Sequence, residues 1–284
     1  MTMRIAVPNK GRLERPATEL LRQSGMRYEK TERSLSVPVA NIDIELLFVR
    51  TDDIPELVAD RVAAVGITGL DIVEEAQLPV EVVAELGFGR CRLSAAVPNS
   101  SEVKCVADFS GLRIATSHPG TTERFFADKG VEITTVPLRG SVEVAPRLDV
   151  ADAIVDLIST GSTMRVNGLR PVVTLLDSQA VLVQHAELDT AEAVLATQVV
   201  TMLRSVLAGR QKRYILMNAP GKDVARISEL IPGFDAPTVV PLAHDGMVAI
   251  HSVVDADHVW SVLPKLQAAG ASGILVLPIE QLIA

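Results

Sequence analysis

Short apolar runs alternate with segments of helical periodicity over the first two thirds of the chain. The strand-like runs cover residues 4–7, 42–49, 63–67, 80–86, 92–97, 112–116, 133–138, 153–158, 172–176 and 180–184. Helical stretches separate many of them, and Pro16 and Pro55 stand where a first helical turn tolerates proline. Alternation of this kind favours an α/β fold with parallel sheets.

These segments form two units. The first runs to about Gly89, and the second begins with the strand at 92–97 and includes a strand–loop–helix–strand unit at 112–138. Residues 86–90 contain two glycines and suit a crossover, because glycine lets the chain change direction. We expect the strand at 180–184 to return the chain to the first unit. A cleft between two such lobes is a common ligand site.

A different pattern follows a long helix expected at 191–209. Strands are indicated at 214–218, 237–242, 247–254 and 273–277, and helices at 224–231 and 258–268. This βαββαβ order is the ferredoxin-like arrangement. Pro264 falls inside the last helix and is expected to kink it.

Composition limits the class of protein. A chain of 284 residues with 48% apolar content is long enough for more than one domain. The net charge of −8 and the 3% aromatic content argue against a nucleic-acid partner. No signal core opens the sequence, and no apolar run approaches a membrane span. The two cysteines, Cys91 and Cys105, suggest a reducing compartment, so we expect a cytoplasmic protein without a membrane partner.

The segment 152–164 carries the clearest chemical signal. Asp152 and Asp156 flank and interrupt an apolar strand, and the sequence Ser-Thr-Gly-Ser-Thr follows at 159–163 before a new helix. Small hydroxyl residues and glycine let backbone N–H groups approach a phosphate, and a helix start adds dipole attraction. A carboxylate at the strand end can accept hydrogen bonds from a ribose diol. The segment therefore favours a phosphosugar site.

An alternative interpretation is purely structural, because a strand, a polar turn and a Ser/Thr helix cap occur in most α/β proteins. The two acids in an otherwise apolar strand favour the phosphosugar site. Alternation along a strand predicts that Asp152 and Asp156 share one face. Two carboxylates on one buried face are costly unless donors or a metal compensate them.

Residues 143–164 resemble the signature of the ATP phosphoribosyltransferase family, the first enzyme of histidine biosynthesis. Asp149 departs from the family pattern, which usually has glycine there, so the local turn is in question. Further segments that resemble the family are 8–13, 50–55, 66–71, 88–94, 113–117, 140–143 and 274–280. The resemblance covers essentially the whole chain.

The resemblance implies a two-lobed, periplasmic-binding-protein-like catalytic core with a C-terminal ferredoxin-like regulatory domain. Lobe I would comprise 1–90 plus about 179–209, lobe II with the loop for phosphoribosyl pyrophosphate (PRPP) 91–178, and the histidine-binding domain 210–284. The implied reaction joins the phosphoribosyl group of PRPP to N1 of ATP and releases pyrophosphate, with Mg²⁺ as cofactor. Such a transfer needs positioning and electrostatics rather than a nucleophilic residue. In agreement, the sequence shows no nucleophile elbow, zinc-type cluster or Walker loop.

The resemblance also assigns residues. Asp156 with Asp152 would bind the ribose diol, Gly11 and Asp71 would contact the nucleotide, and the metal ligands stay unassigned. The 5-phosphate would lie on Ser159, Thr160, Gly161, Ser162 and Thr163. The catalytic residues would be Lys10, Arg12, Arg50 and Glu143. The alternatives are solvated surface charges for the cations, a helix N-cap for Asp71, and structural roles for the histidines, although His118 could flank the cleft.

For the C-terminal domain, the resemblance implies feedback inhibition by histidine through Asn218, Thr238 and Gly273. The chain is of the long kind, so no separate regulatory subunit is expected, and the homo-oligomer would be a dimer or hexamer. The alternative is a structural or oligomerising domain. Two other functions compete with the whole assignment: a two-lobed solute-binding module without catalysis, and a phosphoribosyltransferase for a different acceptor base.

Overall fold

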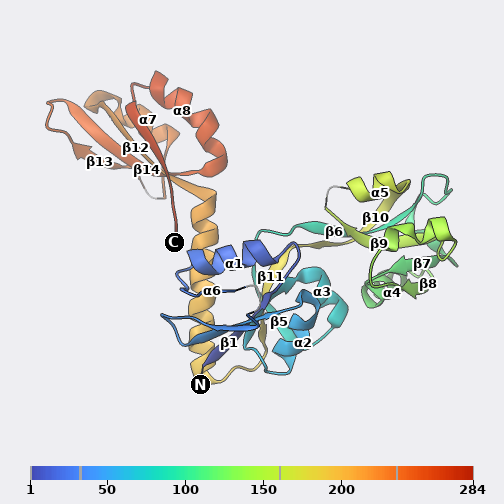
Figure 1. Cartoon of the computed structure of the whole chain (residues 1–284). Helices are drawn as coiled ribbons and strands as arrows, with labels where there is room; N and C mark the ends of the chain where they lie inside the picture. The colour runs from blue at the N-terminus through green and yellow to red at the C-terminus, as the bar shows by residue number, and fades with distance from the viewer. Residues whose placement is uncertain (1, 32–33, 160, 235, 284) are drawn as a thin grey trace. The chain divides into compact units, whose positions relative to one another are not determined.

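The computed structural model describes residues 2–31, 34–159, 161–234 and 236–283 (Figure 1). The chain divides into two compact units, Met1–Glu19 with Met26–Ala196 and Leu20–Gly25 with Thr197–Ala284. The first unit holds the strands of a six-stranded and a five-stranded sheet, and the second holds those of a four-stranded sheet. Both expected lobes thus fall within one unit, which ends at Ala196.

The first sheet has the order β2-β3-β1-β4-β11-β5. Its strands are β1 (Met3–Pro8), β2 (Ser36–Pro38), β3 (Ile44–Val49), β4 (Val65–Gly69), β5 (Val80–Glu85) and β11 (Ala180–His185). β1 pairs in parallel with β3 and β4, whereas β11 is antiparallel to both of its neighbours. The sheet is therefore mixed, whereas the alternation of strands and helices favoured parallel sheets. The predicted return of the chain through 180–184 is confirmed.

Helices α1 (Glu14–Gln23), α2 (Ile54–Ala59) and α3 (Leu70–Ala76) accompany this sheet. Ile54 and Val58 of α2 pack with Ala6 of β1 and with Val181 and Val183 of β11 in one buried cluster. The first turn of α2 contains a proline, as expected. Burial of this apolar face against the sheet fixes the strand ends that carry the site.

The second sheet has the order β10-β6-β9-β7-β8. Its strands are β6 (Cys91–Pro98), β7 (Arg113–Thr116), β8 (Thr134–Pro137), β9 (Ala153–Ile158) and β10 (Leu169–Ser178). β7 is parallel to β8 and β9, and β6 is antiparallel to β9 and β10. Segment 86–90 connects β5 of the first sheet to β6, as predicted, and Gln179 connects β10 back to β11.

Each face of the second sheet has its own core. On one face Phe126 of α4 (Pro119–Asp128) packs against Phe109, with ring centroids 5.1 Å apart. On the other face Met164 of α5 (Ser162–Val166) packs with Ile154 and Ile158 of β9. Short three-ten turns occupy 51–53, 106–109, 142–144, 146–148, 221–223 and 256–258.

The second unit contains most of α6 (Thr190–Gln211) and the elements that follow it. These are β12 (Lys212–Pro220), α7 (Val224–Leu230), β13 (Thr238–Pro241), β14 (Met247–Asp255), α8 (Val259–Ala268) and β15 (Ser272–Pro278). The antiparallel sheet order is β13-β14-β12-β15, so the predicted ferredoxin-like arrangement is confirmed. Residues of α7 and α8, Ile227 and Leu266, pack with Ile215 and Ile250 of the sheet. Helix α8 continues through Pro264.

Helix α6 has 22 residues and a mean hydropathy of 1.3 over its most apolar window. By length and composition it is able to span a bilayer, so the expectation that no apolar run approaches this length was wrong. One such helix is weak grounds for a membrane span, because core helices of water-soluble proteins meet the same criteria.

Candidate active site

The predicted site residues of the first lobe follow the carboxyl ends of neighbouring parallel strands. β1 ends at Pro8, which pairs with Val49 at the end of β3, and β4 runs parallel to β1 on its other side. The residues that follow these ends are Lys10, Gly11 and Arg12 after β1, Arg50 after β3, and Asp71 after β4. The carboxyl edge of parallel strands is the usual ligand site of α/β sheets.

The second lobe repeats this arrangement. In the parallel strands β7, β8 and β9, Thr116 pairs with both Pro137 and Val155, so their carboxyl ends lie at one edge. His118 follows β7, Glu143 lies in the connection after β8, and the loop 159–163 follows β9. The sheet thus gathers the loop, a histidine and a carboxylate at a single edge.

The two carboxyl edges meet at Asp71, whose side chain is only 2% exposed. Its Oδ2 lies 3.5 Å from His118 Nε2, and its Oδ1 accepts a hydrogen bond of 2.5 Å from the Ser178 hydroxyl. Arg12 Nη2 lies 3.6 Å from the same Oδ1. Asp71 therefore joins groups from both lobes.

The environment of Asp71 holds its carboxylate ionised. Burial acts to raise its pKa, but the hydrogen bonds from His118 and Ser178 and the charge of Arg12 prevail, and the pKa is lowered. Gly69 makes room for this geometry, because a Cβ at that position would lie 2.4 Å from Asp71 Oδ1. Asp71 lies in the first turn of α3 but is not its N-cap, which is Gly69.

The loop after β1 holds the Arg12 side chain in position. Gly11 has a φ of +82°, a conformation that favours glycine. Arg12 Nη1 donates a hydrogen bond of 2.5 Å to the Gly89 carbonyl in the crossover. Asn9 Oδ1 is a buried acceptor without a hydrogen-bond partner among the described residues. Buried acceptors normally receive a hydrogen bond, and a ligand bound at this edge would be able to donate one.

Glu75 of α3 contacts the first turn of α4. Its carboxylate accepts hydrogen bonds from the backbone N–H of Gly120, at 2.8 Å, and of Thr121, at 2.7 Å. The Thr121 hydroxyl donates a third bond, also of 2.7 Å, and Arg124 donates to the Glu74 carbonyl. A carboxylate at a helix start satisfies N–H groups that lack partners within the helix. This contact links α3 and α4 across the two lobes.

Asp156 lies in β9 and is half-buried. Burial raises its pKa, and the negative charge of Glu143 acts in the same direction. Its Oδ1 accepts a hydrogen bond of 2.8 Å from the backbone N–H of Leu157. Hydrogen bonds from hydroxyl groups would stabilise the ionised form of this carboxylate, so the site suits a ligand with a diol.

The loop residues are placed as expected where the structure describes them. Ser159 follows β9 directly, Gly161 has a φ of +73°, and Ser162 and Thr163 begin α5. Thr160 lies outside the described residues. Since α5 has only five residues, its dipole is small, and phosphate binding would depend on the N–H and hydroxyl groups of the loop.

The expectation that Asp152 and Asp156 act together is not supported. Asp152 precedes β9, at the opposite end of the strand from the loop. Its carboxylate accepts hydrogen bonds from Arg113, at 2.9 Å from the backbone N–H and 2.9 Å from Nη2, and these bonds lower its pKa. Asp152 is therefore a partner of Arg113, and Asp156 is the carboxylate nearer to the loop.

Asp149 occupies the turn where the resembling family usually has glycine. Its φ is +58°, in the left-handed region that glycine favours and that aspartate tolerates better than most residues. Its carbonyl and its carboxylate both accept hydrogen bonds from the Arg113 guanidinium, at 3.1 and 3.3 Å. The turn is thus formed with aspartate in place.

A cavity of about 430 Å³ lies beside these groups. Its lining includes Ser159 from the loop, Leu70 and Ser178 next to Asp71, and the guanidinium-bearing residues Arg90 and Arg92. The remaining predicted cations, Lys10 and Arg50, are exposed. Among the described residues, no group of three or more His, Cys, Asp or Glu has the arrangement of a metal site.

The residues predicted to bind histidine fall into two places on the four-stranded sheet. Asn218 of β12 pairs with Ser272 of β15, and a Cβ on the neighbouring Gly273 would lie 3.7 Å from Asn218 Nδ2. Thr238, at the start of β13, pairs instead with His251 of β14. The structure therefore groups Asn218 with Gly273 and separates both from Thr238.

Several residues of the site had no individual signal in the sequence. Ser178 and Glu75 were missed because their partners are distant in the chain, 107 residues away in the case of Ser178 and Asp71. His118 was noted only as a residue that could flank the cleft. Proximity to the carboxyl ends of β7 and β4 is the signal that could have pointed to His118 and Glu75.

Fold and site together define a two-lobed α/β core, with a hydroxyl-rich loop on one lobe and cationic side chains on the other. The ATP phosphoribosyltransferase family (HisG) matches residues 50–205, and the HisG C-terminal domain matches residues 209–281. The chain belongs to the ATP phosphoribosyltransferase family. It is accordingly an enzyme of the first step of histidine biosynthesis.

Relatives of this family match over the full chain. The chain is 41% identical over 281 residues to an ATP phosphoribosyltransferase from Bacteroides fragilis, with 99% of each protein covered. It is 44% identical over 282 residues to one from Natronomonas pharaonis, covering 99% of this chain and 100% of that protein.

A solved structure supports the fold. A chain of the ATP phosphoribosyl transferase (HisG:HisZ) complex from Thermotoga maritima superimposes with a TM-score of 0.63 and 27% identity. The match covers 71% of this chain and 96% of that chain.

Proposed function

We propose that the chain transfers the 5-phosphoribosyl group of PRPP to N1 of ATP, forming N1-(5-phosphoribosyl)-ATP and pyrophosphate. The observation that carries this proposal is the meeting of two carboxyl edges at Asp71 and His118, with the hydroxyl-rich loop on one edge and Arg12 on the other. The presence of anion-binding groups from both lobes at this point supports the proposal. Family membership supports the choice of substrates.

The loop and Asp156 are proposed to hold the phosphoribosyl group. The N–H and hydroxyl groups of Ser159, Gly161, Ser162 and Thr163, with Thr160 between them, would bind the 5-phosphate. Asp156 would accept hydrogen bonds from the ribose hydroxyls. These bonds would stabilise the ionised form of its carboxyl group, which burial and the charge of Glu143 disfavour. Asp152 is left out because it is bonded to Arg113.

Cations of the first lobe are proposed to meet the phosphates. Lys10 and Arg50 are exposed and make no hydrogen bond or ion pair through their side chains in the described part of the chain. Arg12 is oriented by the Gly89 carbonyl and by Asp71. Charge development at the sugar carbon and the departing pyrophosphate makes such fixed donors effective. The unpartnered Asn9 Oδ1 is proposed to accept a hydrogen bond from the nucleotide.

Mg²⁺ is the proposed cofactor, and the residues present fit it. Magnesium in phosphate-transfer sites is held mainly by substrate phosphates, with one or two carboxylates. Glu143 and Asp156 are two neighbouring carboxylates, neither of which makes an ion pair among the described residues. When bound, the cation would neutralise charge on the pyrophosphate. The protein itself orients the sugar and the acceptor.

No catalytic base is needed in this account. Adenine N1 carries a free lone pair, so attack on the sugar carbon requires no prior proton removal, and holding the two substrates together supplies much of the rate. His118 is accordingly proposed to position Asp71 rather than to move a proton.

The domain assignment follows the same proposal. Lobe I would comprise 1–90 with about 179–209, and lobe II 91–178. Residues 210–284 would bind histidine and inhibit the enzyme, without a separate regulatory subunit. We further propose a cytoplasmic homo-oligomer. The ferredoxin-like sheet with Asn218 beside Gly273 supports a small-molecule site in this domain, and Thr238 would then belong to a second part of it.

Pyrophosphate release distinguishes this proposal from the two alternatives. The chain is incubated with PRPP, Mg²⁺ and either ATP or a free purine or pyrimidine base. Release with ATP alone is expected. Release only with a free base would identify a different acceptor, and binding of PRPP without release in any mixture would identify a solute-binding module.

A further inference from the structure

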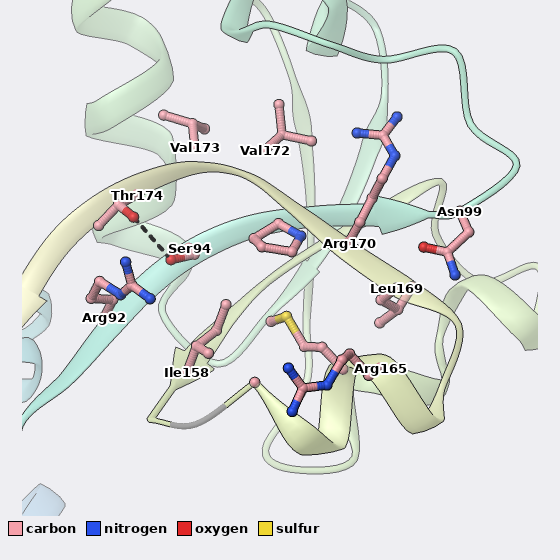
Figure 2. A pocket seen from close by; sticks show the side chains of 13 residues that line it. Arg92, Ser94, Asn99, Ile158, Arg165, Leu169, Arg170, Val172, Val173 and Thr174 are labelled. Carbon is pink, nitrogen blue, oxygen red and sulfur yellow. Dashed lines mark hydrogen bonds between the residues drawn. The ribbon is translucent and has the colours of Figure 1, made fainter.

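A second cavity, of about 700 Å³, opens on the other side of the phosphate loop (Figure 2). Its walls come from β6, β10 and α5, and Gly161 contributes the loop to its lining. Ser159 lines the first cavity and Gly161 lines this one, while Arg92 and Ile158 line both. The loop thus lies between two cavities. Of the two, only the first is lined by Leu70 and Ser178, which adjoin Asp71.

Two arginines give this cavity a positive charge that no described residue neutralises. Arg92 and Arg165 are exposed, and neither makes a hydrogen bond or ion pair with any residue that the structure describes. In the view of Figure 2, Ile158 lies between their side chains. Arg170 differs, because its guanidinium donates to the carbonyls of Ser101, at 2.9 Å, and Val103, at 2.6 Å. In a chain with a net charge of −8, an unneutralised arginine pair is a local anion site.

The rest of the lining is apolar, with one polar pair. Ile158, Met164 and Leu169 are 7%, 5% and 4% exposed and belong to the core on this face of the sheet. Ser94 and Thr174 share a hydrogen bond of 3.3 Å between their hydroxyls, drawn in Figure 2. An apolar wall with a few polar groups and a volume of some hundreds of Å³ is the usual form of a small-molecule site.

We propose that this cavity binds a nucleotide-sized organophosphate at a site separate from the sugar-phosphate site. The phosphate would lie between Arg92 and Arg165, since guanidinium groups form paired hydrogen bonds with phosphate oxygens. The planar body would lie on the apolar wall of Met164 and Leu169. Because Gly161 lines the cavity, a bound ligand would also change the affinity of the loop for its own phosphate. That effect rests on the proposed function, whereas binding in the cavity does not.

Residue-resolved arginine modification tests binding directly. The intact chain is treated with 2,3-butanedione, and the modification rate of each arginine is measured by peptide mass spectrometry, with ADP or inorganic pyrophosphate added. Each measurement is made both without and with saturating ribose 5-phosphate, which fills the loop. At an ADP concentration ten times its dissociation constant, modification of Arg165, which lines this cavity but not the first one, is expected to slow about tenfold. Arg92 lines both cavities, and its modification is expected to slow as well. Arg147, which is exposed elsewhere in this lobe, is the internal control.

A pair of variants completes the test. Arg165→Glu is expected to weaken ADP binding at least about tenfold. At the same ADP concentration, the slowing of Arg92 modification then falls to about twofold or less. Arg147→Glu is expected to change neither the affinity nor the protection. Unprotected Arg165 at all ADP concentrations would overturn the proposal, even with Arg92 protected, because Arg92 also lines the first cavity. Protection that ribose 5-phosphate removes would overturn the claim of a separate site. Neither result depends on transfer activity, so a failed PRPP-plus-ATP assay leaves this test intact.

Discussion

Asp71 Oδ2 and His118 Nε2 lie 3.5 Å apart and join the end of β4 in one lobe to the end of β7 in the other. Ser178 and Arg12 hold the second carboxylate oxygen. The contact between Asp71 and His118 therefore connects the carboxyl edges of the two sheets. The ionised carboxylate of Asp71 contributes to the stability of that arrangement.

Replacing Asp71 with Asn is expected to reduce the free energy of unfolding by about 1–3 kcal/mol at pH 7, because His118, Ser178 and Arg12 lose a charged acceptor. The folded pKa of Asp71 lies below the ordinary value of 3.8. Its stabilising contribution is therefore complete above pH 3.8 and declines as the pH falls toward the folded pKa. Urea unfolding of both proteins across pH 3–8 measures the difference. A difference that grows on acidification would contradict this role.

Asp156→Asn is expected to lower kcat/KM for PRPP by about ten- to a hundredfold, since an amide is a weaker acceptor for the ribose hydroxyls than a carboxylate. Stability should not fall. The ionised Asp156 is disfavoured by burial and by Glu143, so removing its charge leaves the free energy of unfolding equal or higher at neutral pH. Steady-state kinetics and thermal unfolding on the same preparations check both statements. Unchanged kinetics would remove Asp156 from the site.

The raised pKa of Asp156 also predicts a fall of kcat/KM for PRPP on the acid side of its pH profile. Because the pKa of Asp156 is raised from 3.8, kcat/KM for PRPP should begin to fall at a pH above that of an ordinary aspartate. The Asn variant should lack this limb. If both proteins showed the same acid limb, another group would be responsible.

Much of the fold was predictable because it depends on local pattern. The alternation of apolar runs and helices gave most strands of the lobes, and the βαββαβ order gave the C-terminal domain. The three-residue strand β2 was missed, since so short a run has no periodicity to detect. Strand direction was also missed: β6, β10 and β11 pair antiparallel with their neighbours, and no local signal encodes this.

The site was predictable only in part, because some of its contacts join residues that are far apart in the sequence. Loop 159–163 has a local signature, whereas the contact of Asp71 with Ser178 depends on residues 107 positions apart. Asp152 was grouped with Asp156 because alternation along a strand gives the face of a side chain but not which end of the strand it occupies. Arg113, its actual partner, comes from a neighbouring strand.

Gly69→Ala is expected to destabilise the chain by about 1–3 kcal/mol, because a Cβ at this position would lie 2.4 Å from Asp71 Oδ1 and would displace the carboxylate. Gly140→Ala is the matched control: a Cβ there meets nothing within 4 Å. Thermal unfolding measures both. Equal melting temperatures for the two variants would contradict the close fit around Asp71.

Glu75→Gln should loosen the first turn of α4, because an amide has one acceptor oxygen for the three donors that the carboxylate now serves. Amide hydrogen exchange at Gly120 and Thr121 is expected to accelerate about tenfold, which corresponds to about 1.4 kcal/mol. Glu74→Gln is the control, since the backbone carbonyl that Arg124 contacts is retained. Equal exchange in both variants would show that Glu75 does not hold α4.

Thr238→Ala tests regulation by histidine. If Thr238 contacts the inhibitor, the concentration of histidine for half inhibition should rise about tenfold, as expected for one lost hydrogen bond, with activity in the absence of histidine unchanged. The measurement is a histidine titration of PRPP- and ATP-dependent turnover. Full activity of the unmodified enzyme at millimolar histidine would reject the inhibitory role altogether.

The most direct measurement of the central claim is amide hydrogen exchange with and without ribose 5-phosphate, the phosphosugar part of PRPP. Exchange is expected to slow in the segment that spans the end of β9 and the start of α5, residues 158–164, because the sugar phosphate would take hydrogen bonds from its N–H groups. Protection elsewhere in the chain with no change in residues 158–164 would contradict the account.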